Sequence, residues 1–133
     1  MNGRCLAVAK TDSQGEWQLL GLLTFLDPPR PDTKQTIADA RKFGIGVKMI
    51  TGDHLLIAKE TARRLDMGTN IQSASGLPLL DQDTKKKPDG LSEKFGELIF
   101  NADGFAQVFP EHKYLIVECL REMGFKTGFI TII

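Results

Sequence analysis

The feature that most restricts the fold is a run of prolines near residue 30. Pro28, Pro29 and Pro31 lie within four positions. Because proline lacks a backbone N–H and fixes φ, this run can neither extend a sheet ladder nor lie inside a helix. We therefore predict a stiff hinge over residues 27–31, which divides the chain into a short part before it and a longer part after it.

Before the hinge, two apolar runs are separated by a polar turn. The runs cover residues 4–11 and 16–25, and Asp12-Ser13-Gln14-Gly15 lies between them. A glycine-containing polar turn between two such runs is typical of a β-hairpin, so we expect a hairpin here.

After the hinge, helical and strand-like patterns alternate. Alternating helices and strands favour a parallel sheet covered by helices, so the sequence predicts an α/β fold. We expect helices from Asp32 or Thr33 to Gly44, from after Asp53 to Gly68, from an N-cap at Ser92, and from Pro110 to Gly124; strands at residues 46–50, 105–109 and 127–133; and a polar loop at residues 73–90.

Composition argues against some classes of function. Lysine plus arginine equals aspartate plus glutamate, at 17 each, whereas a nucleic-acid-binding domain carries a clustered basic excess. No apolar run approaches the roughly 20 residues that cross a bilayer, so we expect no transmembrane segment and a soluble chain. Cys5 and Cys119 match no metal-ligand spacing, so we predict two buried free thiols in a reducing compartment and no metal site.

The sharpest local motif is Thr51-Gly52-Asp53, at the end of an apolar strand and the start of a helix. Ligands bind at the carboxyl ends of strands in such sheets, and free N–H groups at a helix start attract phosphate. Gly52 would let the backbone approach a ligand closely. The plainer alternative makes Asp53 an N-cap and Thr51 the end of a strand.

Lys113 falls in the first turn of the last predicted helix. A cation there opposes the helix dipole unless an anionic ligand lies beside it, and the alternative is an exposed lysine whose stem bends to water. We expect the neighbouring His112 to be partly exposed and not a ligand. Arg4 could reach a phosphate or lie on a solvent face, and Asp27 could pair with Arg30 across the prolines.

Four motifs follow one another in an order that resembles the P-type ATPases. They are an arginine before a Leu-Ala-Val-Ala strand, then Asp-Pro-Pro-Arg, Met-Ile-Thr-Gly-Asp and Pro-x-His-Lys, and they begin here at Arg4, Asp27, Met49 and Pro110. Each motif alone is weak, and the ordered set is specific. Further stretches, at residues 31–34, 57–63, 102–106 and 108–114, resemble the proton-exporting plasma-membrane pumps.

The resemblance implies a haloacid-dehalogenase-like fold, which is a Rossmann-like parallel sheet, here incomplete and preceded by a β-hairpin. Residues 1–26 would be the C-terminal end of the nucleotide-binding domain, residues 27–31 the hinge, and residues 32–133 a partial phosphorylation domain. The family's Asp-Lys-Thr-Gly-Thr motif is absent from the sequence, and its Gly-Asp-Gly-x-Asn-Asp magnesium motif does not follow Gly128.

The resemblance also implies roles for single residues. Thr51 and Asp53 would lie at the phosphoryl group and Lys113 would steady the phosphorylated aspartate, which makes these three the implied catalytic residues. ATP and Mg²⁺ would serve the parent enzyme, with the Mg²⁺ ligands outside this chain. Calcium-pump relatives have an arginine where this chain has Gln107, so no ATP contact is implied there. The implied nucleotide-binding residues are Arg4, Asp27, Arg30, Thr51, Gly52 and Asp53.

By this resemblance the chain is part of a cation-transporting ATPase, which hydrolyses ATP through an aspartyl-phosphate and couples this to proton export. It would lie at the cytosolic face of the plasma membrane, with ATP and the remainder of the pump polypeptide as partners and no nucleic acid. We expect the chain alone to be inactive. Two alternatives stay open: a non-catalytic regulatory or remnant chain, and a stand-alone phosphatase of the same superfamily, for which Asp81-Gln82-Asp83 has the nucleophile spacing.

Overall fold

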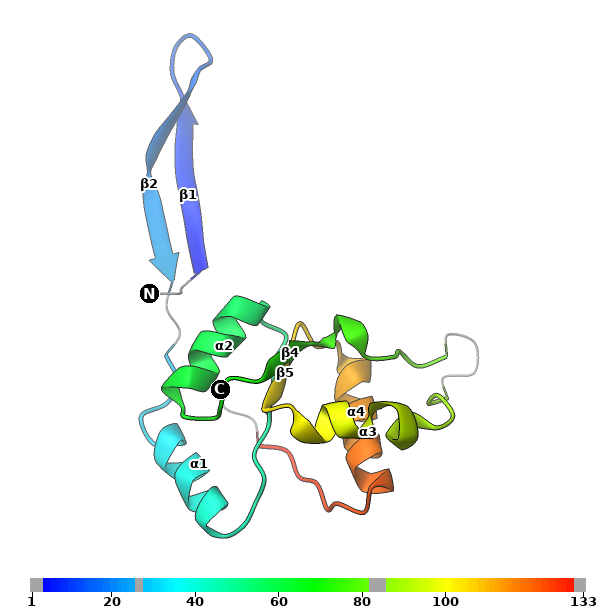
Figure 1. Ribbon diagram of the computed structural model, residues 1–133. Coiled ribbons are helices and arrows are strands. Elements are labelled where there is room, and N and C mark those ends of the chain that lie inside the picture. The colour runs from blue at the N-terminus through cyan, green and yellow to red at the C-terminus, as the bar shows by residue number, and fades with distance from the viewer. Residues whose placement is uncertain (1–3, 26–27, 82–85, 131–133) are drawn as a thin grey trace.

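A computed structural model describes residues 4–25, 28–81 and 86–130, and of Arg4 it describes the backbone. A β-hairpin stands away from an α/β body in which helices flank a small sheet (Figure 1). The predicted α/β class and the predicted hairpin are confirmed. The elements are β1 (Arg4–Thr11), β2 (Trp17–Phe25), α1 (Thr33–Lys42), β3 (Met49–Ile50), α2 (Leu55–Arg64), β4 (Ile71–Ser73), the 3-10 turn η1 (Ala74–Gly76), α3 (Leu91–Asn101), β5 (Gly104–Ala106) and α4 (Pro110–Glu122).

The hairpin pairs β1 with β2 in antiparallel register, from Arg4 opposite Phe25 to Thr11 opposite Trp17. The Asp12 carboxylate closes the turn, because it accepts hydrogen bonds from the backbone N–H groups of Gln14 and Glu16 at 2.8 and 3.0 Å. Short polar side chains that bond their own backbone in this way stabilise tight turns.

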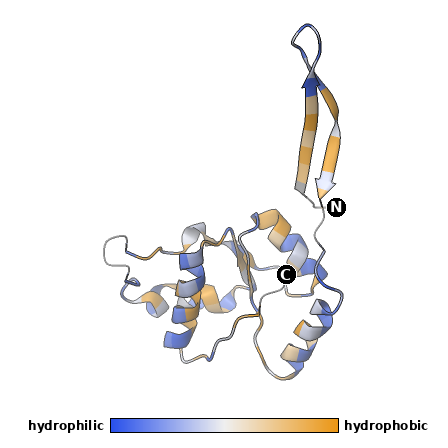
Figure 2. Cartoon of the chain, turned by 180° about the vertical axis from the view of Figure 1, so that it is seen from behind, coloured by the Kyte–Doolittle hydropathy of each residue, from blue (hydrophilic) through white to orange (hydrophobic). Residues whose placement is uncertain are grey.

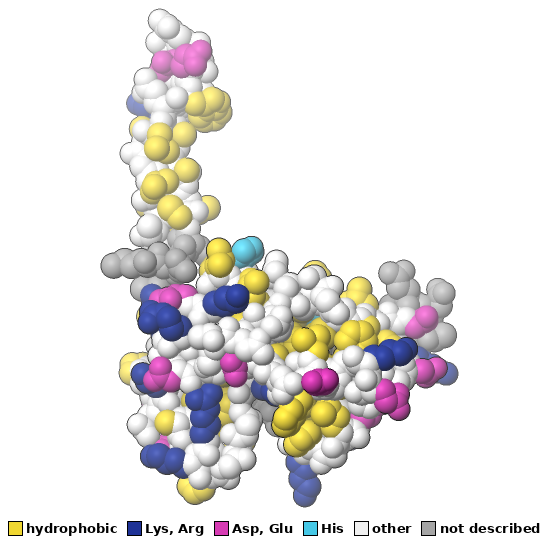
Figure 3. Space-filling view, viewed as in Figure 1, with side chains coloured by type: hydrophobic (Ala, Val, Ile, Leu, Met, Phe, Trp, Pro, Cys, Tyr) yellow, Lys and Arg dark blue, Asp and Glu magenta, His cyan; other side chains and the backbone are white. Residues whose placement is uncertain are grey.

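The hairpin leaves most of its large apolar side chains in water. Figure 2 shows hydrophobic residues along both strands of the hairpin, and Figure 3 shows hydrophobic side chains on its surface. Trp17 is 75% exposed. A two-stranded hairpin has no second layer to cover its faces, and such ribbons are only marginally stable alone. The other exposed large apolar residues of the hairpin are Leu6, Val8, Leu19, Leu20, Leu22, Leu23 and Phe25.

The body is built on a parallel sheet in the order β3-β5-β4, with β5 at its centre. Successive side chains of a strand point to opposite faces. Phe105 accordingly belongs to the hydrophobic cluster with α3 and α4, and Ala106 belongs to the cluster with α1 and α2. The sheet is therefore covered by helices on both faces, as the alternating pattern predicted.

A close backbone approach joins β3 to β5. A side chain at Gly104 would collide with the main-chain oxygen of Met49, and the backbone N–H of Met49 donates to the Asp103 carbonyl at 3.0 Å. Glycine is needed at residue 104 because the two strands leave no room for a Cβ there.

Several sequence expectations about strands were wrong. Strand β4 was missed, because it has only three residues and two of them, Gln72 and Ser73, are polar. The strand predicted at residues 105–109 is Gly104–Ala106, and the strand predicted at 46–50 is Met49–Ile50. The strand predicted at 127–133 is not formed over 127–130, which are irregular and exposed, and the rest of it lies outside the described residues.

Helix ends and cysteines also differ from expectation. Helix α3 has Gly90 as its N-cap in the left-handed conformation, with φ at 68°, so Ser92 lies inside the helix. Beyond α2, the left-handed residue nearest the helix end is Asp66, with φ at 54°, rather than Gly68. Of the two cysteines that we expected to be buried, Cys119 is buried and Cys5 is exposed.

Within the described residues, none of the helices combines the length and the apolar character that a bilayer crossing needs.

Candidate functional site at the carboxyl edge of the sheet

All three strands of the body run in the same direction, so their carboxyl ends meet along one edge of the sheet. Residues 51–53 follow β3, Gln107 follows β5, and Ser73 ends β4. Ligands in open α/β sheets bind at this edge. The motif that the sequence marked as the best candidate therefore lies where the fold favours binding.

The Thr51–Asp53 turn is held by its own side chains. The Thr51 hydroxyl donates to the Asp53 carboxylate at 3.2 Å and accepts from the Asp53 N–H at 3.1 Å. Gly52 between them is exposed, while its two neighbours are half-buried. The helix N-cap is His54, whose Nδ1 lies 3.5 Å from the Leu56 nitrogen. Asp53 is therefore not the N-cap, and its side chain faces Thr51.

Two backbone hydrogen bonds tie this turn to the segment after β5. The Gln107 N–H donates to the Asp53 carbonyl at 2.9 Å, and the Val108 N–H donates to the Thr51 carbonyl at 3.0 Å. Gln107 has φ at 56°, a left-handed conformation that is uncommon outside glycine. Its side-chain oxygen accepts from the Ser73 hydroxyl at 3.2 Å, which links the ends of β5 and β4.

Helix α4 begins directly after this segment, with Phe109 as its N-cap and Pro110 as its first residue. Proline is favoured there because the first helical N–H has no partner within the helix. Lys113 lies in the first turn with its side chain exposed, and its N–H donates to the Phe109 carbonyl at 3.3 Å. The chain thus leads from the left-handed residue at the sheet edge to Lys113 in six residues.

The expectation that His112 is partly exposed was wrong, because its side chain is 4% exposed. Its Nδ1 accepts from the Phe109 N–H at 3.2 Å, which satisfies one of the free donors at the helix start. Burial lowers the pKa of His112, and the nearby Glu111 carboxylate opposes this in part. The imidazole therefore serves as a structural cap of α4.

Of the remaining predicted nucleotide residues, Arg30 is the one whose side chain the structure describes. Arg30 pairs with Asp32, through two bonds of 3.3 and 3.1 Å, on an exposed surface. The expected pairing of Arg30 with Asp27 stays a prediction, because Asp27 lies outside the described residues. Arg4 begins β1 in the hairpin, and its side chain lies outside the description as well. Exposed ion pairs of this kind contribute little stability.

Among the residues that the structure describes, there is no group of three or more His, Cys, Asp or Glu side chains that could hold a metal ion. Mg²⁺ is bound through carboxylate oxygens and water, and the Asp53 carboxylate is already engaged with Thr51. Of the alternative nucleophile motif at Asp81-Gln82-Asp83, only Asp81 is described, in an irregular segment outside the sheet.

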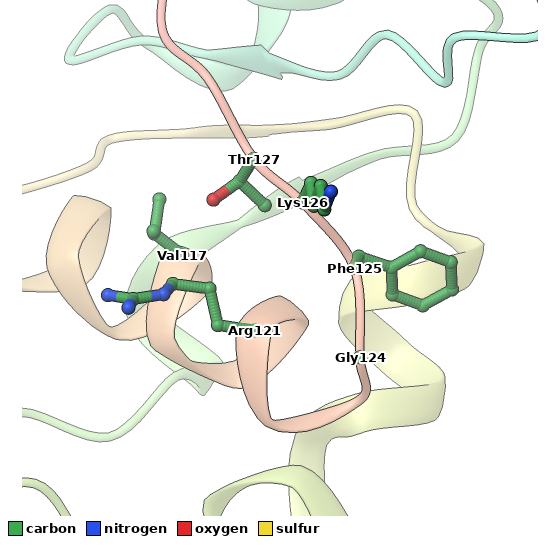
Figure 4. Close-up of a pocket in the computed structure, with 6 residues that line it drawn as sticks. All are labelled: Val117, Arg121, Gly124, Phe125, Lys126 and Thr127. Carbon is green, nitrogen blue, oxygen red and sulfur yellow. The ribbon is translucent and has the colours of Figure 1, made fainter.

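One surface hollow of the body lies away from this edge. Its volume is about 500 Å³, and it lies between the C-terminal half of α4 and the segment that follows (Figure 4). Arg121, which points toward this hollow, is paired with Glu118 at 2.8 Å. The hollow is lined by Val117, Arg121, Gly124, Phe125, Lys126 and Thr127.

Sequence reasoning missed two polar residues at the edge, Gln107 and Ser73. Nothing in the local pattern marks Gln107 as left-handed, because this conformation is set by the contacts with residues 51–53. Ser73 was placed in a loop because strand β4 was not recognised. Gln107 was placed inside the strand predicted at 105–109, whereas β5 ends at Ala106.

Comparison with known proteins finds clear relatives, although no protein-family model matches the chain. It is 58% identical over 122 residues to "Probable proton ATPase 1A" of Leishmania donovani. It is 46% identical over 122 residues to "Plasma membrane ATPase 1" of Saccharomyces cerevisiae, and 41% identical over 126 residues to "Plasma membrane ATPase" of Neurospora crassa. Each match covers 92% of this chain and only 12–13% of the relative.

Proposed function

We propose that this chain, which belongs to the P-type proton ATPases, forms part of the catalytic region with which such a pump handles ATP. One observation carries the proposal: the Thr51–Asp53 turn is fastened to the start of the helix that bears Lys113. This arrangement occurs in a sequence that is 58% identical to a probable proton ATPase. Hydrolysis through an aspartyl-phosphate, coupled to proton export at the plasma membrane, is the activity proposed for the whole protein.

We assign the body to a haloacid-dehalogenase-like phosphorylation domain, from residue 32 onward. The parallel sheet with helices on both faces is compatible with this assignment. Residues 1–26 would form the C-terminal end of the nucleotide-binding domain, and residues 27–31 would be the hinge. The separation of the hairpin from the body at Pro28–Pro31 supports this division (Figure 1).

The proposed task of the Thr51–Asp53 turn is to hold phosphate. Gly52 offers an exposed backbone without a side chain, and helix α2 begins two residues after Asp53. A helix start attracts anions through its free N–H groups and dipole. The Thr51 hydroxyl, which donates to the Asp53 carboxylate in this structure, would have to turn to the phosphate to add a further hydrogen bond. Arg4, Asp27 and Arg30 are assigned to the nucleotide by resemblance alone.

Lys113 is proposed to neutralise charge on the phosphorylated aspartate. A cation in the first turn costs roughly 0.3–1 kcal/mol against the helix dipole, and an anion beside it reverses that cost. Charge builds up during phosphoryl transfer, and preorganised cations stabilise it most in the transition state. Mg²⁺ would supply further charge neutralisation from ligands on the rest of the polypeptide.

A segment exchange tests this proposal. The matched 122-residue segment of the Leishmania relative is replaced by the corresponding segment of this chain, and phosphoenzyme formation from labelled ATP is measured. We predict that Lys113→Ala lowers the rate about 10- to 100-fold, since a hydrogen bond to a charged group contributes about 1.5–3 kcal/mol. The melting temperature should not fall, because the substitution removes an unfavourable charge at a helix start.

The matched control is Lys59→Ala, which removes another exposed lysine, on α2, and should leave the rate unchanged. A rate for Lys113→Ala equal to that of the unmodified exchange would remove this lysine from the site. A large drop in melting temperature would make its role structural. The chain by itself should form no acid-stable phosphoenzyme, since the Asp-Lys-Thr-Gly-Thr motif does not occur in it.

A further inference from the structure

We infer that Gln107 is a positioning residue: its left-handed backbone holds the Thr51–Asp53 turn in register with the helix that carries Lys113. The inference rests on the proposed function and assigns a role to a residue for which the resemblance implies none. It starts from the strained backbone at the carboxyl edge of the sheet, where φ of Gln107 is 56°.

The left-handed residue lies between two fixed structures. Before it, β5 is the central strand, and Phe105 and Ala106 are completely buried. After it, Val108 is buried in the cluster with α3 and α4. A non-glycine residue keeps a strained φ only where its surroundings hold it there. The strain at Gln107 is therefore retained by the burial of the residues on both sides.

The strained backbone allows two hydrogen bonds to form between the segment after β5 and the Thr51–Asp53 turn. The N–H groups of Gln107 and Val108 are consecutive in the chain, and they reach the carbonyls of Asp53 and Thr51, respectively. The turn is thereby gripped at both ends while Gly52 stays exposed. A Cβ added at Gly52 would lie 3.8 Å from the Val108 carbonyl oxygen, an ordinary van der Waals distance, so a small side chain fits there without a clash.

The same segment fixes the start of α4. Phe109 follows Val108, its N–H is capped by His112, and its carbonyl accepts from the Lys113 N–H. The phosphate-holding turn and Lys113 are therefore joined through a single stretch of five residues. A change of φ at residue 107 would shift the turn relative to the lysine without removing either group.

The side chain of Gln107 offers a competing explanation, because it accepts a hydrogen bond from Ser73. Two variants separate the side chain from the backbone. Gln107→Gly and Gln107→Ala both lose the bond to Ser73, but only glycine adopts positive φ without cost. Any difference between them therefore reports on the backbone conformation alone.

The first readout is geometric and uses this chain itself. Hydrogen exchange of the Val108 amide, which is bonded to the Thr51 carbonyl, should stay at the native level in Gln107→Gly and become about 5- to 10-fold faster in Gln107→Ala. The exchange of core amides, such as that of Ile116 in α4, should remain unchanged in both variants. Equal exchange of Val108 in the two variants would overturn the inference.

The second readout is phosphoenzyme formation in the exchanged pump. Gln107→Gly should keep the rate within about twofold, and Gln107→Ala should lower it about 3- to 10-fold. When Lys113→Ala is also present, the difference in rate between Gln107→Gly and Gln107→Ala should shrink, because there is no longer a lysine side chain for the turn to be aligned with. Equal losses in Gly and Ala would assign the effect to the Ser73 contact and overturn the inference. If Lys113→Ala alone has no effect while Gly and Ala still differ, the role proposed for Lys113 fails and the positioning of the turn stands.

Discussion

At the scale of single residues, His112 shows how a polar side chain can serve a helix start from inside the core. Its ring accepts from the Phe109 N–H, and burial lowers its pKa from the ordinary value of 6.5. The folded protein therefore binds a proton at His112 less readily than the unfolded chain does. The stability associated with this group is present above pH 6.5 and is lost as the pH falls through the lowered pKa.

We predict that the melting temperature of the chain falls between pH 7.5 and pH 5, and that His112→Asn flattens this part of the profile. The amide oxygen of asparagine can accept the same hydrogen bond, but it does not titrate. Thermal unfolding followed by circular dichroism at constant ionic strength measures the effect. The Glu60 carboxylate, whose pKa Arg63 and Arg64 lower from 4.5 to about 2, affects both proteins equally and therefore does not change the difference between them. Parallel profiles for the two proteins would contradict the prediction.

At the scale of elements, a lysine from outside the helix caps the C-terminus of α3. The Lys48 ammonium, just before β3, donates to the carbonyls of Phe100 and Ala102 at 2.6 and 2.7 Å. Helix ends carry carbonyls without intrahelical partners and a partial negative charge, both of which a cation satisfies. Burial lowers the pKa of Lys48, and the Asp103 carboxylate opposes this. This contact anchors α3 to the edge of the sheet.

We predict that Lys48→Met lowers the free energy of unfolding by about 1–3 kcal/mol, since two carbonyls lose a charged donor. Methionine keeps most of the apolar length of the side chain. Denaturant unfolding measures the change, and Lys59→Met on the exposed face of α2 is the matched control. An effect no larger than that of the control would show that water replaces the ammonium at no cost.

The same scale shows how far the sequence predicts the elements. The patterns that specified α1, α2 and α4 are long enough to show a helical period and end in a positive-φ residue, such as Gly44 and Gly124. Strand β4 has three residues, which is too short for any period. The end of α2 was misplaced because Asp66 adopts the left-handed conformation that glycine usually takes. Lys34 and Arg41 hold Asp66 there, through its carboxylate and its carbonyl respectively.

Some features of the candidate site could likewise be predicted from the sequence, and others could not. Residues 51–53 and Lys113 could be predicted because they belong to short motifs with local chemistry. The role of Gln107 and the burial of His112 could not, because both depend on contacts between segments more than 50 residues apart in the chain, or on core packing that no local pattern records.

At the scale of the whole molecule, the hairpin presents apolar side chains that its two strands cannot cover. Contiguous exposed apolar surface of this kind promotes association, and the outer edges of β1 and β2 offer unpaired backbone groups. The body is enclosed by helices on both faces of its sheet. We therefore expect self-association of the isolated chain to originate in the hairpin.

We predict that the double substitution Leu20→Lys and Leu22→Lys reduces self-association at least severalfold while leaving the melting temperature of the body unchanged. Both leucines are exposed on β2. Sedimentation velocity over a range of concentrations measures the effect. The matched control adds the same charge but keeps both leucines, through Gln18→Lys and Thr24→Lys on the same strand. If the control dissolves the associates equally well, charge rather than apolar contact governs association.

The position of Trp17 has a spectroscopic consequence. It is the only tryptophan in the sequence, and it lies at the turn end of the hairpin, three-quarters exposed to water. Its emission is therefore that of a hydrated indole even when the α/β body is fully folded. Fluorescence would follow events at the hairpin, such as contact with a second chain, and would be almost blind to melting of the body. A tryptophan fluorescence signal that does not change during heating would thus report on the hairpin and not on the body. Unfolding of the body is better followed by the circular dichroism of its helices.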